Sequence, residues 1–235
     1  MKIALLGYGR MGQTIEKIAL NRGHDIVLKI DKDDSGYDIT TADVAIDFSI
    51  PTVAFSNITH CLNHNVPVIS GTTGWLERYN EAVDLCKTKK GAFIYASNFS
   101  LGVNIFFELN RTLAKMMANL GQYNISMEEI HHTQKLDAPS GTAISLAEDI
   151  LAQNNTYTKW SLDKADMDNS IPIIAKRIPD VPGTHTVTYK SEVDTITIEH
   201  EAHNRQGFAL GAVVAAEWIV GKTGVFTMKD VLNIG

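Results

Sequence analysis

Residues 128–143, EEIHHTQKLDAPSGTA, gather side chains that can transfer protons and hold anions. His131 and His132 are adjacent, and Lys135 follows shortly after them. An imidazole gains or loses a proton near neutral pH, and a lysine ammonium adds a positive charge. This combination predicts acid–base chemistry on an anionic substrate.

The end of this segment, DAPSGT, predicts the beginning of a helix. Pro139 suits a first helical turn, which would also contain Ser140, Gly141 and Thr142. The backbone N–H groups of a first turn have no partners within the helix, and a glycine lets a ligand approach them. We expect an anion site here, with Lys135 beside it.

Other interpretations of this segment remain open. The histidine pair could be a solvated strand end, Lys135 an ordinary surface lysine, and Ser140 only a helix cap. Zinc is disfavoured, because His131 and His132 lack the i, i+4 spacing and nearby glutamate of a zinc hydrolase, so we expect no metal. Adjacent side chains on a strand point to opposite faces. For both histidines to serve one site, the strand must end at about Ile130.

A second motif lies at the start of the chain, where a G-x-G-x-x-G follows an apolar run over Lys2–Leu6 and precedes a helical pattern over 13–22. Its glycines permit a tight turn and close approach of a pyrophosphate to a helix start. Asp31, at the end of the next strand, suits the ribose hydroxyls of NAD, whereas Lys32 could meet the 2′-phosphate of NADP. The alternative is an ordinary βα turn followed by a solvated acid. The loop residues are Gly7, Tyr8, Gly9, Arg10, Met11 and Gly12.

The elements around this loop alternate between strands and helices. Further strands are expected over 26–30, 42–48, 66–70 and 92–96. Helices are expected over 51–64, with Ser49 as N-cap and Pro51 in the first turn, and over 75–90. This order predicts an α/β fold, a Rossmann-type doubly wound parallel sheet. Dinucleotides lie along the carboxyl ends of such strands, which adds further cofactor-binding residues: Gly71, Thr72, Thr73, Ser97, Asn98, Phe99 and Ser100.

The pattern changes after residue 101. A long helix to about 119, a strand over 125–130, a helix over 139–153 and alternating strands over 185–189 and 193–202 indicate an inserted α+β domain with a mixed sheet. Residues 154–182 are expected to be rich in loops. We assign 1–101 and 207–235 to a dinucleotide-binding domain, and 102–206 to a substrate-binding and oligomerisation domain.

Composition excludes several classes of protein. The net charge is −6 and there is no basic run, so we expect neither nucleic acid nor an anionic membrane as partner. No apolar run is long enough to span a bilayer. Cys61 and Cys86 are unclustered, which is typical of reduced cysteines in a cytoplasmic protein.

Taken together, these motifs resemble the 4-hydroxy-tetrahydrodipicolinate (dihydrodipicolinate) reductase family. Its signature, E-x-x-H-H-x-x-K-x-D-A-P-S-G-T-A, is complete over residues 128–143. The likeness extends along the chain through GTTG at 71–74, SNFSLG at 97–102 and PGTHTV at 182–187. The glycine loop is one residue shorter than the family's G-x-G-G-R-M-G, and Pro179 stands where an R-x-G-D pattern has glycine.

The resemblance implies an NAD(P)H-dependent oxidoreductase of lysine and diaminopimelate biosynthesis, a homotetramer. It would use NADH or NADPH to reduce 4-hydroxy-tetrahydrodipicolinate, a small cyclic dicarboxylate, with loss of water. The resemblance makes His131 the general acid/base and Lys135 the proton donor. The carboxylates would be held by His132, Ser140, Gly141 and Thr142. The alternatives are a related amino-acid dehydrogenase and a non-catalytic NAD(P)-binding sensor.

Overall fold

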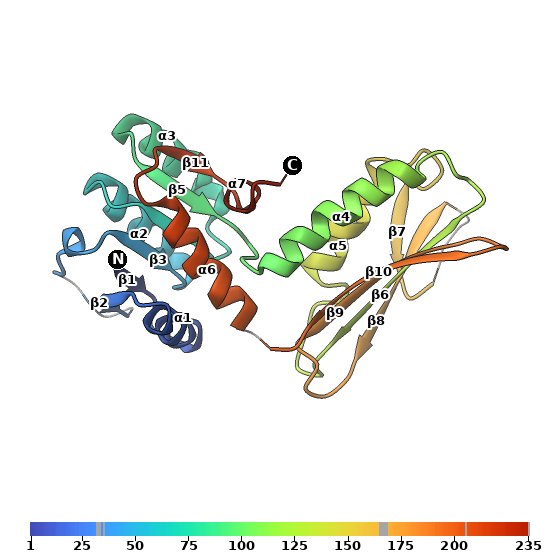
Figure 1. Ribbon diagram of the computed structural model, residues 1–235, viewed down its shortest axis with the longest axis horizontal. Helices are drawn as coiled ribbons and strands as arrows, with labels where there is room; N and C mark the ends of the chain where they lie inside the picture. The colour runs from blue at the N-terminus through green and yellow to red at the C-terminus, as the bar shows by residue number, and fades with distance from the viewer. Residues whose placement is uncertain (32–33, 35, 165–168, 205, 235) are drawn as a thin grey trace. The chain divides into compact units, whose positions relative to one another are not determined.

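The computed structural model describes residues 1–235 except 32–33, 35, 165–168, 205 and 235. The chain divides into two compact units, each described separately (Figure 1). The first unit comprises Met1–Asn104 with Gln206–Gly235, and the second comprises Ile105–Arg205. Among the described residues, no helix has the length and apolar character of a membrane span.

The first unit contains a parallel sheet in the order β11-β5-β4-β3-β1-β2. Its strands are β1 (Lys2–Leu6), β2 (Asp25–Ile30), β3 (Val44–Asp47), β4 (Val68–Ser70), β5 (Ala92–Tyr95) and β11 (Gly224–Phe226). The helices are α1 (Arg10–Asn21), α2 (Pro51–Asn63), α3 (Tyr79–Lys89), α6 (Gln206–Ile219) and α7 (Met228–Leu232), with short 3-10 turns η1 (Ile39–Thr41) and η2 (Leu76–Arg78).

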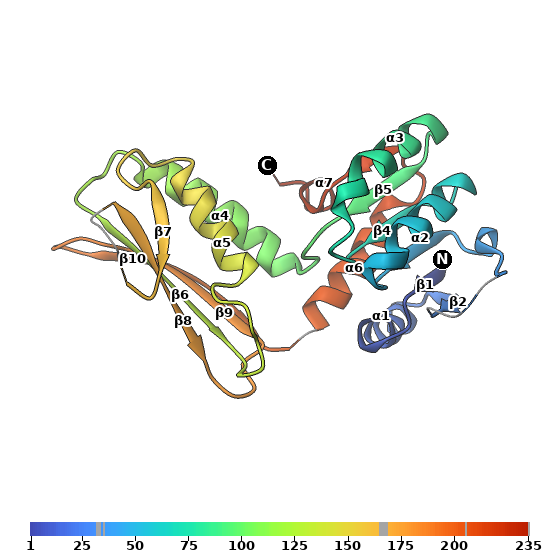
Figure 2. The same ribbon diagram turned by 180° about the vertical axis from the view of Figure 1, so that it is seen from behind.

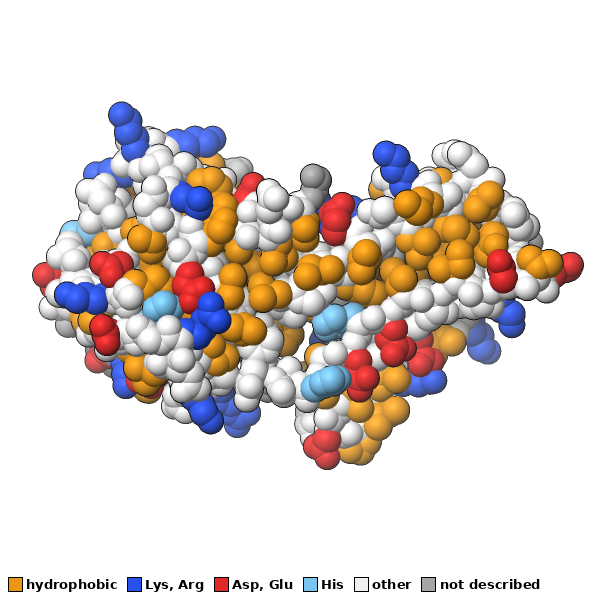
Figure 3. Space-filling view, viewed as in Figure 1, with side chains coloured by type: hydrophobic (Ala, Val, Ile, Leu, Met, Phe, Trp, Pro, Cys, Tyr) orange, Lys and Arg blue, Asp and Glu red, His pale blue; other side chains and the backbone are white. Residues whose placement is uncertain are grey.

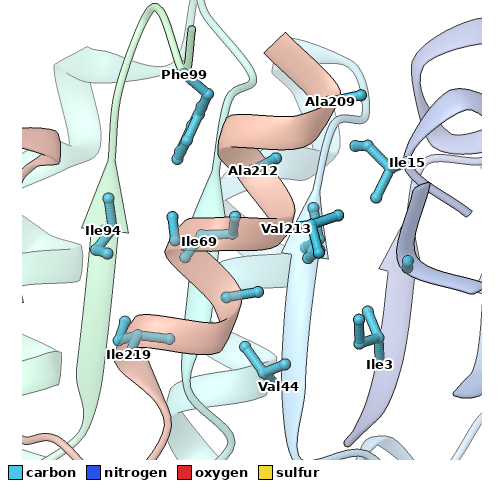
Figure 4. Close-up of a cluster of buried hydrophobic side chains, with 14 of the residues drawn as sticks. Ile3, Ile15, Val44, Ile69, Ile94, Phe99, Ala209, Ala212, Val213 and Ile219 are labelled. Carbon is cyan, nitrogen blue, oxygen red and sulfur yellow. The ribbon is translucent and has the colours of Figure 1, made fainter. Parts of the chain in front are cut away.

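Alternation along β1 shows why helices cover both faces of this sheet. Ile3 and Leu5 pack with residues of α1 and α6. The close-up of this cluster shows Ile3 with Ile15 of α1 and Val213 of α6 (Figure 4). Ala4 and Leu6 pack on the other face with residues of α2 and α3. Strands buried on both faces are typical of a doubly wound fold. The expected Rossmann-type architecture is therefore confirmed.

Two details of the first unit differ from expectation. The N-cap of α2 is Ile50, without a side-chain cap, because the Ser49 hydroxyl donates instead to Asp47 Oδ1 at 2.7 Å. The chain after α6 adds β11 and α7, which the sequence analysis did not include. β11 is only three residues long, and its pairing with β5 at the sheet edge forms it.

The second unit contains a mixed sheet in the order β10-β9-β6-β8-β7. Its strands are β6 (Asn124–His131), β7 (Lys159–Leu162), β8 (Ser170–Arg177), β9 (Gly183–Lys190) and β10 (Thr195–Ala202). β6 runs parallel to β8 and antiparallel to β9. Two helices, α4 (Leu101–Met117) and α5 (Gly141–Leu151), lie on one face of this sheet (Figures 1 and 2). A mixed sheet with helices on one face confirms the expected α+β class of this unit.

The loop-rich interpretation of 154–182 was wrong, because this region contributes β7 and β8 to the sheet. In β8, Pro172 and the charged pair Lys176 and Arg177 obscure the alternation of the strand. Pairing with β6, which is distant in sequence, stabilises it instead.

Helix α4 exposes several apolar side chains on the surface of this unit. Ile105, Leu109 and Met116 on α4 are 44%, 54% and 69% exposed, and Figure 3 shows hydrophobic side chains along this helix.

Candidate active site

The glycine loop of the first unit has the shape that a dinucleotide requires. Gly7 has φ +98°, and a Cβ there would lie 2.2 Å from the Phe48 carbonyl oxygen. A Cβ at Gly12 would lie 2.3 Å from the Gly7 oxygen. At Gly9, by contrast, a Cβ would meet no atom of the described residues within 4 Å. Two glycines thus close the turn, and the third leaves open space at the start of α1, where a pyrophosphate fits.

A cavity of about 430 Å³ adjoins this loop at the carboxyl ends of β1, β2 and β3. It is lined by Gly7, Ile30, Asp31, Asp34, Gly36, Tyr37, Ser49, Ile50, Val53, Ser56, Asn57 and His60. The predicted ribose ligand Asp31 is therefore on its wall, whereas Lys32 lies outside the described residues. A pocket at this edge of the sheet suits the adenosine part of a dinucleotide.

The other loop residues differ in what their side chains contact. Met11 is partly buried against the core of the first unit. The Tyr8 hydroxyl donates to the carboxylate of Glu16, which also pairs with Lys29 at 2.6 Å. Arg10 is exposed at the first position of α1. Of these side chains, that of Arg10 is the best placed to reach a phosphate.

A buried carboxylate, Asp47 at the end of β3, organises the neighbouring loops and was missed by the sequence analysis. It accepts hydrogen bonds from Ser49 and Asn57 through Oδ1 and from Ser70 and Thr72 through Oδ2, at 2.7–2.9 Å. Burial raises the pKa of Asp47, and these bonds act against that shift. The signal was the acid in the otherwise apolar stretch VAIDF, residues 44–48.

The contact with Asp47 limits which residues of the loop 71–73 can bind a cofactor. The Thr72 hydroxyl donates to Asp47 and accepts from the Ser49 N–H at 2.8 Å, so Thr72 holds the loop in place. A Cβ at Gly71 would lie 2.3 Å from the Phe48 ring. Thr73 is exposed. Its side chain and the loop backbone therefore remain for a cofactor.

The SNFS turn follows β5, the neighbour of β4 in the sheet. Phe99 is buried in the core, and Asn98 Oδ1 accepts from the Ser100 N–H at 2.9 Å. The Ser100 hydroxyl accepts from the Val103 N–H at 3.4 Å near the start of α4. Ser97 is exposed. Three of the four side chains thus shape the turn, and only Ser97 is directed to solvent.

In the second unit, the signature segment leaves β6 at His131. This strand continues one residue beyond the expected end at Ile130, and His131 lies on its inward face with 8% exposure. His132 is half-buried just beyond the strand. The Lys135 N–H donates to the His132 carbonyl at 3.1 Å, which forms the turn after the strand. The two histidines therefore belong to different environments.

Lys135 is in an ion pair rather than free. Its Nζ lies 2.8 Å from both oxygens of Asp137, and this contact lowers the pKa of the Asp137 carboxyl. Arg177, at the end of β8, donates to the carbonyls of Lys135 at 3.4 Å and Asp137 at 2.7 Å. The loop that carries Lys135 is thus fixed from β8.

The expected helix start was two residues too early. Pro139 follows a cis peptide bond and precedes the helix, Ser140 is the N-cap, and α5 begins at Gly141. The Ser140 hydroxyl accepts from the Ala143 N–H at 3.2 Å, and its N–H donates to Glu129 at 2.9 Å. The first turn therefore leaves Gly141 and Thr142 nearer to solvent, and a Cβ at Gly141 would meet no described atom within 4 Å.

Two residues that the sequence analysis missed, Glu129 and His185, adjoin His131. Glu129 is fully buried, and its Oε2 lies 3.6 Å from His131 Nδ1 and 3.8 Å from His185 Nε2. Burial, together with smaller effects of nearby His131, His200 and Lys135, lowers the pKa of His185 to about 3. Burial also lowers the pKa of His131, which Glu129 partly opposes. At neutral pH both imidazoles are uncharged.

These three side chains also have the types that ligate metals. One ligand atom from each of Glu129, His131 and His185 lies within 4.8 Å of the others. However, Glu129 Oε1 already accepts from the Arg177 guanidinium at 3.2 Å, so a cation of the protein itself pairs with this carboxylate. A divalent ion would have to compete with it. The absence of a metal stays a prediction, which elemental analysis for zinc would test.

Comparisons with known proteins agree along the whole chain. The family model described as dihydrodipicolinate reductase, N-terminus, matches residues 1–99, and the C-terminus model matches 102–232. A 4-hydroxy-tetrahydrodipicolinate reductase of Christiangramia forsetii is 63% identical, covering 99% of this chain and 98% of the relative. The corresponding enzyme of Thermosipho africanus is 34% identical over the same shares of both chains.

A solved structure is similar as well. Dipicolinate-bound dihydrodipicolinate reductase from Paenisporosarcina sp. TG-14 has a TM-score of 0.77 and 25% identity, with 97% of each chain covered. These matches favour the reductase over the related dehydrogenases and the sensor considered above. The chain belongs to the dihydrodipicolinate reductase family, and it is an oxidoreductase that uses NADH or NADPH to reduce 4-hydroxy-tetrahydrodipicolinate.

Proposed function

We propose that His131 and Lys135 carry the proton transfers of this reductase, and that the start of α5 binds a carboxylate of the substrate. The observation that supports this most is their placement on one short segment. An inward histidine with a lowered pKa and a lysine held by Arg177 are followed directly by a helix N-terminus. A small dianion requires this combination of proton transfer and positive potential.

Gly7, Gly9 and Gly12 hold the pyrophosphate of the cofactor in this proposal, and Asp31 accepts from the adenosine ribose. The open space at Gly9 and the position of Asp31 on the cavity wall support these roles. Thr73, Ser97 and the backbones of their loops lie at the same edge of the sheet and contact the rest of the cofactor. When bound, the reduced nicotinamide supplies the hydride that the reaction consumes.

The protons are then handled by the second unit. Loss of the 4-hydroxyl as water places one proton on the leaving oxygen and releases one from the adjacent ring carbon. Lys135 donates the first, and neutral His131 accepts the second. After reduction at C4, His131 returns its proton to the ring carbon. The net consumption is one hydride and one proton, with one water formed.

The substrate carboxylates interact with Gly141, Thr142 and His132 in this arrangement, while Ser140 holds the helix start. Gly141 and Thr142 occupy the first turn of α5, where N–H groups point outward without helical partners. The helix dipole adds a partial positive charge at the same place.

The ligand pyridine-2,6-dicarboxylate, a planar ring with two carboxylates, tests this assignment. Thr142→Val should weaken its binding by about 1 kcal/mol or more, because the variant keeps the shape and loses one hydroxyl donor. Calorimetry in the presence of NADH measures the change, and Thr158→Val, at a position outside the proposed site, is the control. Equal affinity of wild type and Thr142→Val would remove this hydroxyl from the site.

The cofactor assignment has its own test. Asp31→Ala should raise the KM for NADH more than that for NADPH, because the carboxylate accepts from the ribose hydroxyls but repels a 2′-phosphate. We expect wild-type KM values for the two cofactors to lie within about tenfold of each other. Paired steady-state kinetics decide the question, with Asp25→Ala at the beginning of β2 as control. An unchanged ratio of the two KM values would contradict the role of Asp31.

We further propose that the protein is a cytoplasmic homotetramer built through the mixed sheet. Support comes from the second unit, where both α4 and α5 pack on one face of this sheet. The opposite face carries polar side chains on β9 and β10, with Thr186 donating to Glu199 at 2.9 Å and the Thr188 and Thr197 hydroxyls 3.4 Å apart. Sedimentation equilibrium tests the proposal, and a mass of one chain would reject it.

A further inference from the structure

The buried carboxylate of Glu129 occupies a position where the strand pattern calls for an apolar side chain. β6 directs Ile125, Met127, Glu129 and His131 inward, and the first two belong to the core under α4 and α5. Glu129 is 0% exposed. A carboxylate at such a depth is unfavourable unless charges and hydrogen bonds compensate for its lost hydration.

The compensation comes from the end of β8 and from the N-cap of α5. Arg177 Nη2 donates to Glu129 Oε1 at 3.2 Å, and the Ser140 N–H donates to Oε2 at 2.9 Å. The same guanidinium donates to the carbonyls of Lys135 and Asp137. Glu129 therefore links the loop that carries Lys135, through Arg177, to the cap of α5, through Ser140.

Arg177 reaches this position because of the sheet register. His131 on β6 is paired with Arg177 on the parallel neighbour β8, and Glu129 is paired with Ala175. Paired residues share a face of the sheet, so the guanidinium emerges beside the histidine. A small residue opposite Glu129 leaves room for this arrangement.

Glu129 also faces the ring of His131, at a distance too long for a hydrogen bond but short for a charge interaction. The other charged or titratable groups facing this ring are Lys135 and Asp137 from the loop, Arg177 from β8 and His185 from β9. Glu129 is the strongest influence that raises the pKa of His131 against the effect of burial.

We propose that Glu129 is a positioning residue of the reductase. Through Arg177 and Ser140 it fixes the loop that carries Lys135 and the start of α5. Through its negative charge it also influences the protonation of His131. This inference rests on the roles proposed above for His131 and Lys135. It assigns no contact between Glu129 and the substrate.

The test compares two neighbouring carboxylates. Glu129→Gln keeps the size of the side chain, removes its charge and presents an amide donor where two donors already converge. Glu128→Gln is the matched control, because Glu128 lies on the opposite face of the same strand and pairs with Lys176. We expect Glu129→Gln to lower kcat by about 10- to 100-fold with an unchanged Kd for NADH. Glu128→Gln should stay within about twofold of wild type, as is usual for an exposed ion pair.

The pH profile separates positioning from general loss of structure. Without the carboxylate, protonated His131 loses its nearest opposite charge, so its pKa falls and the acid-side limb of kcat/KM moves to lower pH. Arg177→Lys should lower kcat as well, because lysine lacks the forked donors, but it keeps the charges and should leave that limb near its wild-type position.

A Glu129→Gln protein with kcat within threefold of wild type and a superimposable pH profile would overturn the proposal. If Glu129→Gln does not fold, as judged by circular dichroism, Arg177→Lys alone decides, and wild-type kcat in that variant would overturn it. His131→Gln serves as the reference. If that variant retains full activity, the proposed catalytic roles are wrong, whereas an inactive His131→Gln beside a fully active Glu129→Gln refutes only the role of Glu129.

Discussion

Lys135→Ala should lower kcat by about 10²- to 10⁴-fold, because in the proposed mechanism the reaction then loses its general acid. The Kd for NADH should remain within about twofold of wild type, since Lys135 lies outside the unit that carries the glycine loop. Its side chain is 22% exposed and pairs with Asp137, so it is ordered yet accessible to a substrate. Steady-state kinetics give kcat, and quenching of protein fluorescence gives the Kd.

Lys176→Ala provides the matched control for this experiment. Lys176 belongs to the same unit and also pairs with a carboxylate, that of Glu128, but on the opposite face of the sheet. Replacing Lys176 removes the same positive charge without altering the loop that carries Lys135. A decrease in kcat of less than about tenfold for Lys135→Ala would show that another group donates the proton.

His131→Gln should lower kcat over a similar range of about 10²- to 10⁴-fold and remove the acid-side limb of the pH–rate profile. Burial lowers the pKa of His131 from its ordinary value of 6.5, because the charged imidazolium loses hydration. The neutral imidazole is the form that accepts the proton. Wild-type activity should therefore decline only when the pH falls below the ordinary histidine pKa of 6.5. The measurement is kcat/KM over a range of pH.

His64→Gln is the control for the histidine experiment. His64 is exposed at the C-terminal end of α2 and is not among the residues lining the cavity of the first unit. Its replacement should leave both kcat and the limb unchanged. An acid-side limb that persists in His131→Gln would show that a different group titrates.

The first unit could be predicted well because its signals are local. Gly7 and Gly9 lie between a short apolar strand and an amphipathic helix, and Gly12 lies in the first turn of that helix, so each of these patterns is complete within a few residues. β7 and β8 could not be predicted in the same way. β8 is stabilised by pairing with β6, and β7 by pairing with β8. Within β8, Pro172 interrupts the alternation that would have indicated a strand.

The candidate site shows the same division. His131, Lys135 and Gly141 stand out by type and spacing. The importance of Glu129 and Arg177 depends instead on the register between β6 and β8, whose paired residues lie 46 positions apart in the sequence. The signature directed attention to Glu128, which the structure places on the outer face. Counting inward positions along β6 would have identified Glu129, because it is an acid in an apolar series. Pro139 misled the helix prediction, because it precedes the N-cap Ser140 and α5 begins only at Gly141.

Asp47 makes four positions along the rim of the first sheet energetically interdependent. Ser49, Asn57, Ser70 and Thr72 all donate to one buried carboxylate. Replacing one donor leaves the others to compensate, while replacing two leaves the carboxylate short of partners, so the effects of such substitutions will not add. A change tolerated at Ser70 in one relative can therefore be damaging in another that differs at Thr72. Attempts to alter cofactor choice by redesigning this rim should vary these four positions as a group or leave all of them intact.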